Sequence, residues 1–460
     1  MEQIVVTKPI ITKKIEGVSV LHVMIPSPVF VIRVDVLAGF LDEDTTSKGA
    51  AHALEHMSII YNQNEKEDGG LKKLEEYGAT IDGNTSHQIT SYIGKGKENW
   101  VDNTRRLSTM VLKFLMDVIT RPNFTKENLE RENQSIHLEY SRRFYSKLND
   151  IEIKALKHIY KGYSFYDALE KPETLMITDI EILKSFRNKF YTKNRIVIST
   201  MGLSNNLKVI EKIIADAFEK YDVKGELAIP NFKQVITTST ITSGFFIQKI
   251  PAIQSCRSIY ILPLVNLTYF SENLLAVIVF MTVLKEGLFS RLYESLRSEG
   301  KNLVYSISVQ LLVDIFPSGN NALIIEYDTS IENAVKAIKL VKGLLGNIKK
   351  NEYERVSRIL QSQLAKINME DILNYLILKT LTQFEGEPIS LPHERKKINN
   401  LLDSTLNPNN NSFFLGIPDS VKDEELKIIQ TELEQIFKTN LSISSPFIHE
   451  NYLSHYRKRK

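Results

Sequence analysis

Runs of β-branched and other apolar residues mark the expected strands of this chain. Residues 18–24 and 29–36 have this character, and Pro26 and Pro28 separate them, so two strands are expected there. Further strands are expected over residues 79–93, 195–201, 236–249, 257–262, 303–328 (a pair) and 412–416.

Apolar residues that recur with a period near 3.6 predict the helices. Residues 70–78 form a short amphipathic pattern that Gly78 closes, which is typical of a helix end. The other expected helices cover about 97–120, 125–148, 179–191, 205–220, 270–298, 331–348 and 422–438.

The order of these elements is similar in the two parts of the chain, although no repeat of residues is visible. This order predicts an α+β fold with two similar halves, each a mostly antiparallel sheet covered by helices. Residues 223–235 contain Gly225 and Pro230 but few periodic apolar residues, so they are the expected linker. We therefore expect one domain over residues 1–222 and a second over residues 236–460.

Composition narrows the class of protein. A net charge of +3 over 460 residues is too small to indicate a nucleic-acid partner. Cys256 is the only cysteine, which excludes an intrachain disulfide and fits a reducing compartment. The N-terminus lacks the pattern of a signal peptide, and the most apolar run, residues 274–284, is too short to span a membrane. We expect a soluble, cytoplasmic protein.

Residues 52–56 carry the most informative motif, H-x-x-E-H. On a helix, His52 and His56 lie on one face, so both can bind one metal ion. Glu55 lies on the same side and can take a proton from a water that the metal activates. The alternative is a solvated polar stripe, but the small and apolar neighbours Ala51 and Leu54 favour a buried cleft.

A catalytic zinc needs a third protein ligand. Glu132 and Glu139 are seven residues apart, close to two helical turns, so both lie on one face of the helix expected at 125–148. Taken alone, both could be ordinary surface glutamates. The residues themselves leave open which of them binds the metal.

These motifs resemble the insulinase/pitrilysin family of zinc metallopeptidases, the inverted-motif (inverzincin) enzymes, and in particular its short bacterial and mitochondrial-processing-peptidase-like branch. The resemblance covers about residues 15–440. It implies one Zn²⁺ per chain on His52, His56 and Glu139, with Glu132 as a supporting carboxylate. The interval from His56 is 83 residues to Glu139 and 76 to Glu132. The shorter interval is typical of the family, whereas the local context favours Glu139, which we prefer.

Two further segments resemble the family. Asp82, Gly83, Asn84 and Thr85 are similar to its edge strand, which implies that they hold a peptide by β-augmentation. The segment 288–306 is similar to a family segment whose Arg and Tyr contact substrate and polarise the scissile carbonyl, which implies these catalytic roles for Arg297 and Tyr305.

The resemblance implies a zinc endopeptidase that cleaves peptides or unstructured segments in a chamber made by two chains. Arg297 and Tyr305 would then act on the zinc site of the partner chain. Three alternatives stay open: a homodimer, a heterodimer in which this chain is the metal-bearing subunit, and a non-catalytic peptide-binding subunit. The sequence leaves three substrate classes open, which are short peptides, leader peptides and bacteriocin precursors.

Overall fold

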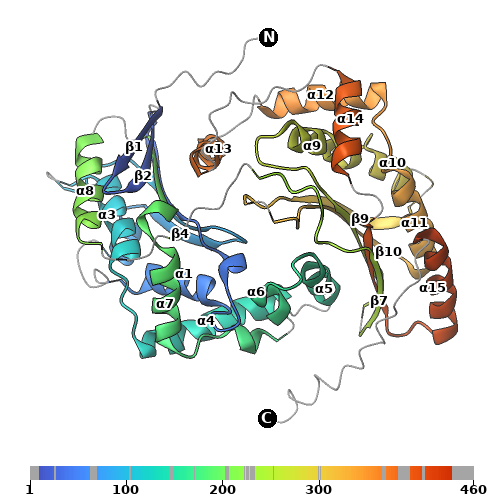
Figure 1. Cartoon of the computed structure of the whole chain (residues 1–460), viewed down its shortest axis with the longest axis horizontal. Coiled ribbons are helices and arrows are strands. Elements are labelled where there is room, and N and C mark those ends of the chain that lie inside the picture. The colour runs from blue at the N-terminus through green and yellow to red at the C-terminus, as the bar shows by residue number, and fades with distance from the viewer. Residues whose placement is uncertain are drawn as a thin grey trace.

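The chain folds into two halves, each with one β-sheet and helices packed against it, as a computed structural model shows (Figure 1). The structure describes residues 10–24, 27–62, 70–102, 105–144, 149–169, 171–202, 207–221, 223, 227, 234–251, 253–298, 300, 302–316, 318–364, 369–381, 394–406 and 410–437.

The first half contains a six-stranded sheet in the order β1-β2-β6-β3-β5-β4. Only the β2–β6 pairing is parallel. The strand β4 lies at one edge, where it pairs with β5 alone. The strands are β1 (Ile10–Ile15), β2 (Val18–Val23), β3 (Val29–Val36), β4 (Thr80–Thr85), β5 (Thr90–Lys97) and β6 (Ile196–Met201).

The helices of the first half pack against this sheet, against one another or, for α5, against the sheet of the second half, and α1 lies beside both β4 and α4. They are α1 (Ala50–Ile60), α2 (Leu71–Glu76), α3 (Leu107–Thr120), α4 (Lys126–Phe144), α5 (Asn149–Ile159), α6 (Ser164–Ala168), α7 (Ile180–Phe190) and α8 (Leu207–Glu219). Short 3-10 turns occupy Phe40–Asp42, Pro172–Leu175 and Lys193–Arg195.

The second half contains a five-stranded sheet in the order β7-β11-β8-β10-β9, with only β7–β11 parallel. Its strands are β7 (Gly244–Ile250), β8 (Cys256–Pro263), β9 (Val304–Leu312), β10 (Ala322–Thr329) and β11 (Ser412–Pro418). Its helices are α9 (Glu272–Lys285), α10 (Arg291–Leu296), α11 (Ile331–Gly343), α12 (Lys350–Leu364), α13 (Met369–Leu381), α14 (Arg395–Thr405) and α15 (Asp423–Phe437). The predicted fold class, two α+β halves with mostly antiparallel sheets, is confirmed.

One helix of each half packs on the sheet of the other half. The helix α13 packs on β2 and β6, where its Leu376 and Ile377 join an apolar cluster with Leu21 and Met201. Conversely, α5 of the first half packs on β8 and β11 of the second half. The two halves therefore share their hydrophobic cores, which removes apolar surface of both sheets from water.

Polar contacts reinforce this exchange of helices. The Arg257 guanidinium on β8 lies 2.7 Å from a carboxylate oxygen of Glu152 on α5. In addition, the Phe316 backbone N–H donates to the Gln88 side-chain oxygen at 2.9 Å. Because both bonds are at least partly buried, the orientation of the halves is fixed by specific contacts as well as by apolar packing.

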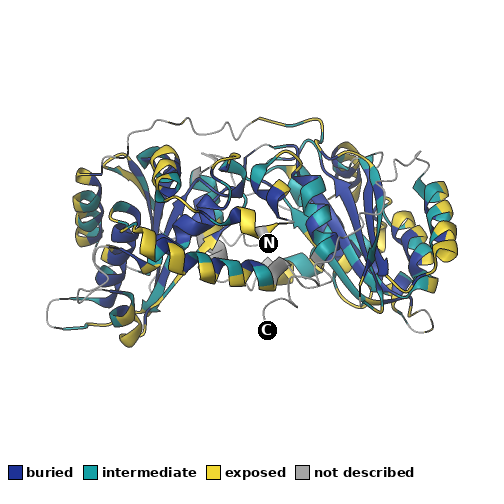
Figure 2. Ribbon diagram, turned by 90° about the horizontal axis from the view of Figure 1, so that it is seen from below, coloured by how far each residue is buried: buried dark blue, intermediate teal, exposed yellow. Residues whose placement is uncertain are grey.

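Burial follows the two sheets. Buried residues concentrate in the strands of both halves and on the helix faces turned toward them, while the outer helix faces are exposed (Figure 2). This distribution is what the period-3.6 patterns of the helices require.

Three helix predictions were wrong in their extent, and the one over 331–348 ends already at Gly343. The helix predicted over 270–298 is interrupted between α9 and α10, where Gly287 has a φ of 79°, a conformation that favours glycine and ends helices. The helix predicted over 97–120 begins only at Leu107. Pairing with β3 extends β5 as far as Lys97, so tertiary contacts override the helical pattern there.

The strand predicted over 236–249 is also shorter than expected and begins at Gly244. The preceding hydroxyl side chains of Ser239 and Thr240 donate to the Gly319 carbonyl instead of continuing a strand. The strand β1 was not predicted. The expected linker over residues 223–235 lies mostly outside the described residues, so the domain boundaries stay a prediction.

Candidate metal centre and active site

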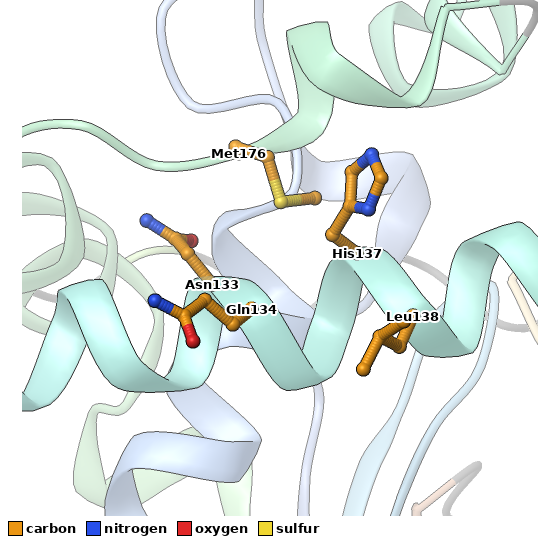
Figure 3. Close-up of a pocket in the computed structure, with 5 residues that line it drawn as sticks. All are labelled: Asn133, Gln134, His137, Leu138 and Met176. Atoms are coloured by element: carbon orange, nitrogen blue, oxygen red, sulfur yellow. The ribbon is translucent and has the colours of Figure 1, made fainter. Parts of the chain in front are cut away.

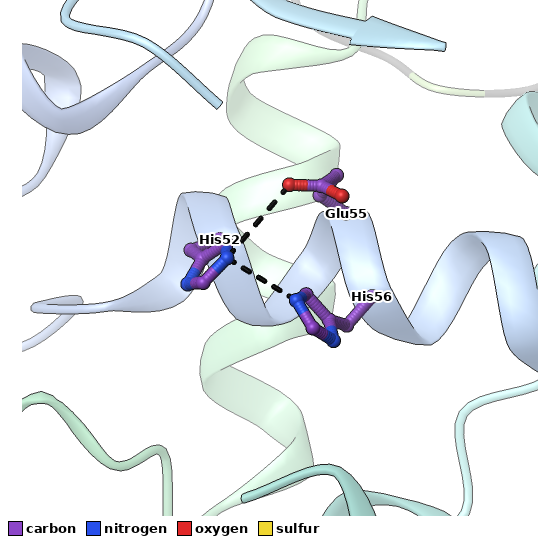
Figure 4. A group of neighbouring side chains, drawn as sticks. All are labelled: His52, Glu55 and His56. Atoms are coloured by element: carbon purple, nitrogen blue, oxygen red, sulfur yellow. Dashed lines mark hydrogen bonds and ion pairs between the residues drawn. The ribbon is translucent and has the colours of Figure 1, made fainter. Parts of the chain in front are cut away.

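The helix α1 brings His52, Glu55 and His56 together (Figure 4). Their potential ligand atoms all lie within 4.8 Å of one another. The Nε2 atoms of the two histidines are 3.2 Å apart, and a Glu55 carboxylate oxygen lies 4.0 Å from the Nε2 atom of His52. The i, i+4 spacing on one helix therefore produces the convergence that the sequence predicts.

The helix α4 supplies both glutamates. A Glu139 oxygen lies 3.4 Å from the Nε2 atom of His52 and 3.5 Å from that of His56. Glu132 lies on the other side of the His56 ring, with an oxygen 3.1 Å from its Nδ1 atom. The two glutamates thus contact different atoms, although they share one face of α4.

Two tyrosines complete the surroundings of the histidines. The Tyr140 hydroxyl lies 3.0 Å from the Nδ1 atom of His52, and the Tyr61 hydroxyl donates to Glu132 at 3.2 Å. Both imidazoles therefore have a partner at Nδ1, which leaves both Nε2 atoms directed toward Glu139. Neither tyrosine was predicted from the sequence, although Tyr140 directly follows Glu139 and could have been found from that position.

A buried carboxylate holds the start of α1. Glu43 accepts hydrogen bonds from the backbone N–H groups of Gly49 and Ala51, at 2.7 and 2.9 Å. These are donors that a helix N-terminus leaves unsatisfied, and the helix dipole also favours a carboxylate there. Burial raises the pKa of Glu43 to about 8, while the two bonds oppose that shift. Glu43, which precedes the motif by nine residues, thus anchors the helix that carries the histidines.

The carboxylates around the two histidines stabilise positive charge at this place. Burial by itself disfavours a charged imidazole, but the bonds with Glu132 and Glu139 raise the pKa of His56 to about 9. Bonds with the two histidines hold the pKa of Glu139 well below its usual range. Burial raises the pKa of Glu55, and the neighbouring imidazoles oppose that shift. The carboxylates would favour a metal cation at this place as they favour a proton.

The three closest ligand atoms fit a tetrahedral zinc. Zinc binds nitrogen and carboxylate oxygen at about 2.0–2.2 Å, so neighbouring ligand atoms of a tetrahedron lie about 3.3–3.6 Å apart. The separations among the Nε2 atoms of His52 and His56 and the Glu139 oxygen are 3.2, 3.4 and 3.5 Å. The Glu55 oxygen lies 4.0 Å from the Nε2 atom of His52, which is longer than the separation of two ligand atoms of one tetrahedral zinc.

The edge strand β4 lies directly beside α1. Asp82 and Asn84 are exposed, whereas Thr85 is buried and its hydroxyl donates to a Glu55 oxygen at 3.0 Å. Gly83 lies close to the Glu55 carboxylate. The four residues predicted to bind substrate therefore divide into two that face solvent and two that face the motif helix.

The structure does not bring Arg297 and Tyr305 to this cluster within one chain. Arg297 follows α10 and Tyr305 lies on β9, in the half opposite to α1 (Figure 1). Both are exposed, with a relative exposure of 61% for Tyr305. Leu288 and Phe289, just before α10, are exposed as well.

A separate hollow of about 450 Å³ lies along α4 (Figure 3). Because Glu132 and Glu139 lie about two turns apart on one face, the residues of α4 that line the hollow belong to the opposite face. The lining residues are Asn133, Gln134, His137, Leu138 and Met176. The hollow is therefore distinct from the histidine cluster.

Among the residues that the structure describes, no helix combines the length and the apolar character needed to cross a membrane.

The motif H-x-x-E-H is that of the inverted-motif zinc peptidases. The sequence model described as insulinase (peptidase family M16) matches residues 20–172 of this chain. A second model, described as the peptidase M16 inactive domain, matches residues 179–361. The chain belongs to the M16 peptidase family, as its motifs indicate.

Relatives and solved structures agree with this assignment. The zinc protease YmxG of Bacillus subtilis is 23% identical over 357 residues, which are 76% of this chain and 75% of that protein. The β subunit of the mitochondrial-processing peptidase of Saccharomyces cerevisiae is 23% identical over 200 residues, 42% of this chain and 40% of that subunit. A protease from Helicobacter pylori shares the fold, with a TM-score of 0.72 and 14% identity over 89% of this chain and all of that one.

Proposed function

We propose that this protein is a zinc-dependent endopeptidase that cleaves peptides or unstructured segments. One observation carries the proposal: the Nε2 atoms of His52 and His56 and an oxygen of Glu139 are spaced as ligands of a tetrahedral zinc. The names of the relatives, two zinc proteases and subunits of processing peptidases, support the same activity.

In this proposal His52, His56 and Glu139 hold the zinc, while Glu132 and Tyr140 orient the two imidazoles. A zinc bound there would acidify a coordinated water and polarise the peptide carbonyl. Glu55 takes the proton from the attacking water and passes it to the leaving amine. Its buried carboxylate suits this role because burial raises its pKa above the ordinary value.

The edge strand β4 would hold the substrate. Within the part of the chain that the structure describes, no strand pairs with its outer side, so its main-chain groups can pair with an extended peptide beside α1. Main-chain pairing is insensitive to side-chain identity, which suits a peptidase that accepts unstructured segments. Asp82 and Asn84, whose side chains are exposed, would contact substrate side chains.

The substitution Glu55→Gln tests the activity. The variant should bind zinc like the wild type but hydrolyse peptides at least roughly 100-fold more slowly, since it lacks the general base. Lys212→Gln, an exposed change on α8, is the matched control and should keep full activity. Equal turnover by the Glu55→Gln variant and the wild type, with zinc bound in both, would exclude Glu55 as the base.

A two-chain assembly is part of the proposal. Arg297 and Tyr305 are exposed and lie in the half opposite to the histidine cluster, so in one chain they are available to a partner. A homodimer would give each zinc site an Arg297 and a Tyr305 from the partner chain. The second candidate is a heterodimer, in which this chain is the metal-bearing subunit; the relatedness to a subunit named β favours it.

A further inference from the structure

The side chain of Thr85 contacts the carboxylate proposed as the general base. Its hydroxyl donates to one Glu55 oxygen at 3.0 Å, and the bond is buried. Thr85 and Glu55 have relative exposures of 9% and 6%. A buried hydrogen bond to a charged acceptor has a fixed direction and is stronger than a neutral one.

The other Glu55 oxygen lies against the backbone of the same strand. A Cβ atom at Gly83 would lie 2.2 Å from that oxygen and 2.6 Å from a methyl carbon of Ile59. Gly83 and Thr85 are two residues apart, so both face α1 from β4. The carboxylate is therefore held between a hydroxyl donor and a backbone that approaches closely because residue 83 has no side chain.

The main chain that carries Thr85 is itself held in place. The backbone N–H groups of Phe40 and Leu41 donate to the carbonyls of Ser86 and His87, at 3.0 and 2.8 Å. The Thr90 hydroxyl, on the strand paired with β4, donates to the Ala38 carbonyl at 2.9 Å. These bonds fix the end of β4 relative to the segment that leads into α1.

Glu55 lies close enough to the metal site for its orientation to matter. The oxygen that accepts the Thr85 bond is 4.0 Å from the Nε2 atom of His52, compared with 3.4 Å for the Glu139 oxygen. A rotation of the Glu55 side chain would bring a carboxylate among the ligand atoms, where it would act as a ligand and not as a base.

We propose that Thr85 is a positioning residue that holds Glu55 in the orientation of a base and keeps it from becoming a metal ligand. Gly83 provides the space for this orientation. The inference rests on the proposed function, since it assigns a role to Glu55 in the same site.

The test compares Thr85→Val, which keeps the shape but removes the donor, with Thr85→Ser, which keeps the hydroxyl. Thr85→Val should lower kcat roughly 10- to 100-fold, the scale of a misplaced catalytic group, with KM within about twofold and zinc content unchanged. Thr85→Ser should recover most of the lost kcat. Thr431→Val, an exposed change on the distant helix α15, is the matched control and should behave like the wild type.

A wild-type kcat in Thr85→Val, or an equal loss in Thr85→Ser, would overturn the proposal. If Thr85→Val does not fold, the pair Thr85→Ala and Thr85→Ser decides in the same way, because they differ only in the hydroxyl.

Crystal structures of the zinc-loaded wild type and Thr85→Val separate this proposal from the function itself. A rotated Glu55 carboxylate in Thr85→Val is the expected result, and an unchanged carboxylate would overturn the proposal. A wild type that binds zinc but cleaves no peptide would contradict the proposed function. In that case the orientation of Glu55 in the two structures alone decides the role of Thr85.

Discussion

The Nδ1 atom of His56 lies 3.1 Å from a carboxylate oxygen of Glu132, a residue 76 positions further along the chain. Glu132 therefore contacts the side of the imidazole that faces away from Glu139. A carboxylate in this position fixes the ring and its tautomer and makes the opposite nitrogen a better ligand.

This relationship predicts unequal effects of two similar substitutions. Glu139→Gln should abolish tight zinc binding, because it removes the negative charge of a ligand. Glu132→Gln should weaken zinc binding by only roughly 10- to 100-fold, the usual cost of losing an outer partner. Titration of each variant against a chelator of known zinc affinity measures both. The reverse ranking would identify Glu132 as the ligand.

The Tyr140 hydroxyl should support zinc binding by His52, as Glu132 supports zinc binding by His56. Tyr140→Phe removes the hydroxyl that lies 3.0 Å from the Nδ1 atom of His52 and keeps the ring. We expect zinc affinity or activity to fall by at least roughly 10-fold. The same chelator titration applies, and Tyr77→Phe, an exposed tyrosine, serves as the control. Unchanged affinity in Tyr140→Phe would show that His52 needs no partner at Nδ1.

The pKa of His56 gives a pH dependence with a definite sign. In the folded, metal-stripped protein this pKa is raised to about 9, above the ordinary value of 6.5. The group therefore stabilises the fold fully below about pH 6.5, and this contribution is lost as the pH rises through about 9. The loss should be on the order of 1–3 kcal/mol, seen as a falling Tm of EDTA-treated protein.

Added zinc should oppose this loss of stability at high pH. Zinc needs the neutral imidazole, so the stabilisation that added zinc provides should grow with pH over the same window. In the metal-stripped protein, Glu132→Gln should make the decrease of Tm with rising pH smaller. The reason is that it removes one of the carboxylates that raise the pKa of His56. A metal-stripped wild type whose Tm is flat or rises from pH 6.5 to 9 would contradict this assignment.

The separation of α1 from Arg297 predicts complementation between chains. Glu55→Gln and Arg297→Ala should each be inactive as homodimers. Co-expressed as mixed dimers, they should recover part of the peptide hydrolysis, because one of the two composite sites is intact. Mass spectrometry of the intact assembly verifies that the dimers are mixed. Mixed dimers as inactive as their parents would point to a heterologous partner or to sites formed within one chain.

The sequence predicts how residues of one helix are arranged in the site, but not which residues of separate elements come into contact. The spacing of His52 and His56 is a helical property, so their convergence follows from the motif alone. Glu132 and Glu139 have the same helical phase but lie about 10 Å apart along α4. Which one reaches the Nε2 atoms depends on how α4 crosses α1, and the sequence alone does not contain that information.

Thr85 illustrates the same limit. The pattern over residues 79–93 predicts one strand, where the structure has the pair β4 and β5, and the resemblance implies an edge strand whose residues bind substrate. Only the packing of β4 against α1 shows that the Thr85 hydroxyl contacts Glu55. The exchange of α5 and α13 between the halves was likewise not predictable, because their apolar patterns are those of helices that cover their own sheet.

The zinc site itself is best tested by anomalous diffraction from crystals of the zinc-loaded protein at the zinc absorption edge. The central claim is that His52, His56 and Glu139 hold one zinc ion. We expect one strong anomalous peak per chain, about 2.0–2.2 Å from the Nε2 atoms of both histidines and from a Glu139 oxygen. The peak should be absent from crystals of His56→Ala. No peak between these atoms, or a peak bound by Glu132 in place of Glu139, would contradict the account.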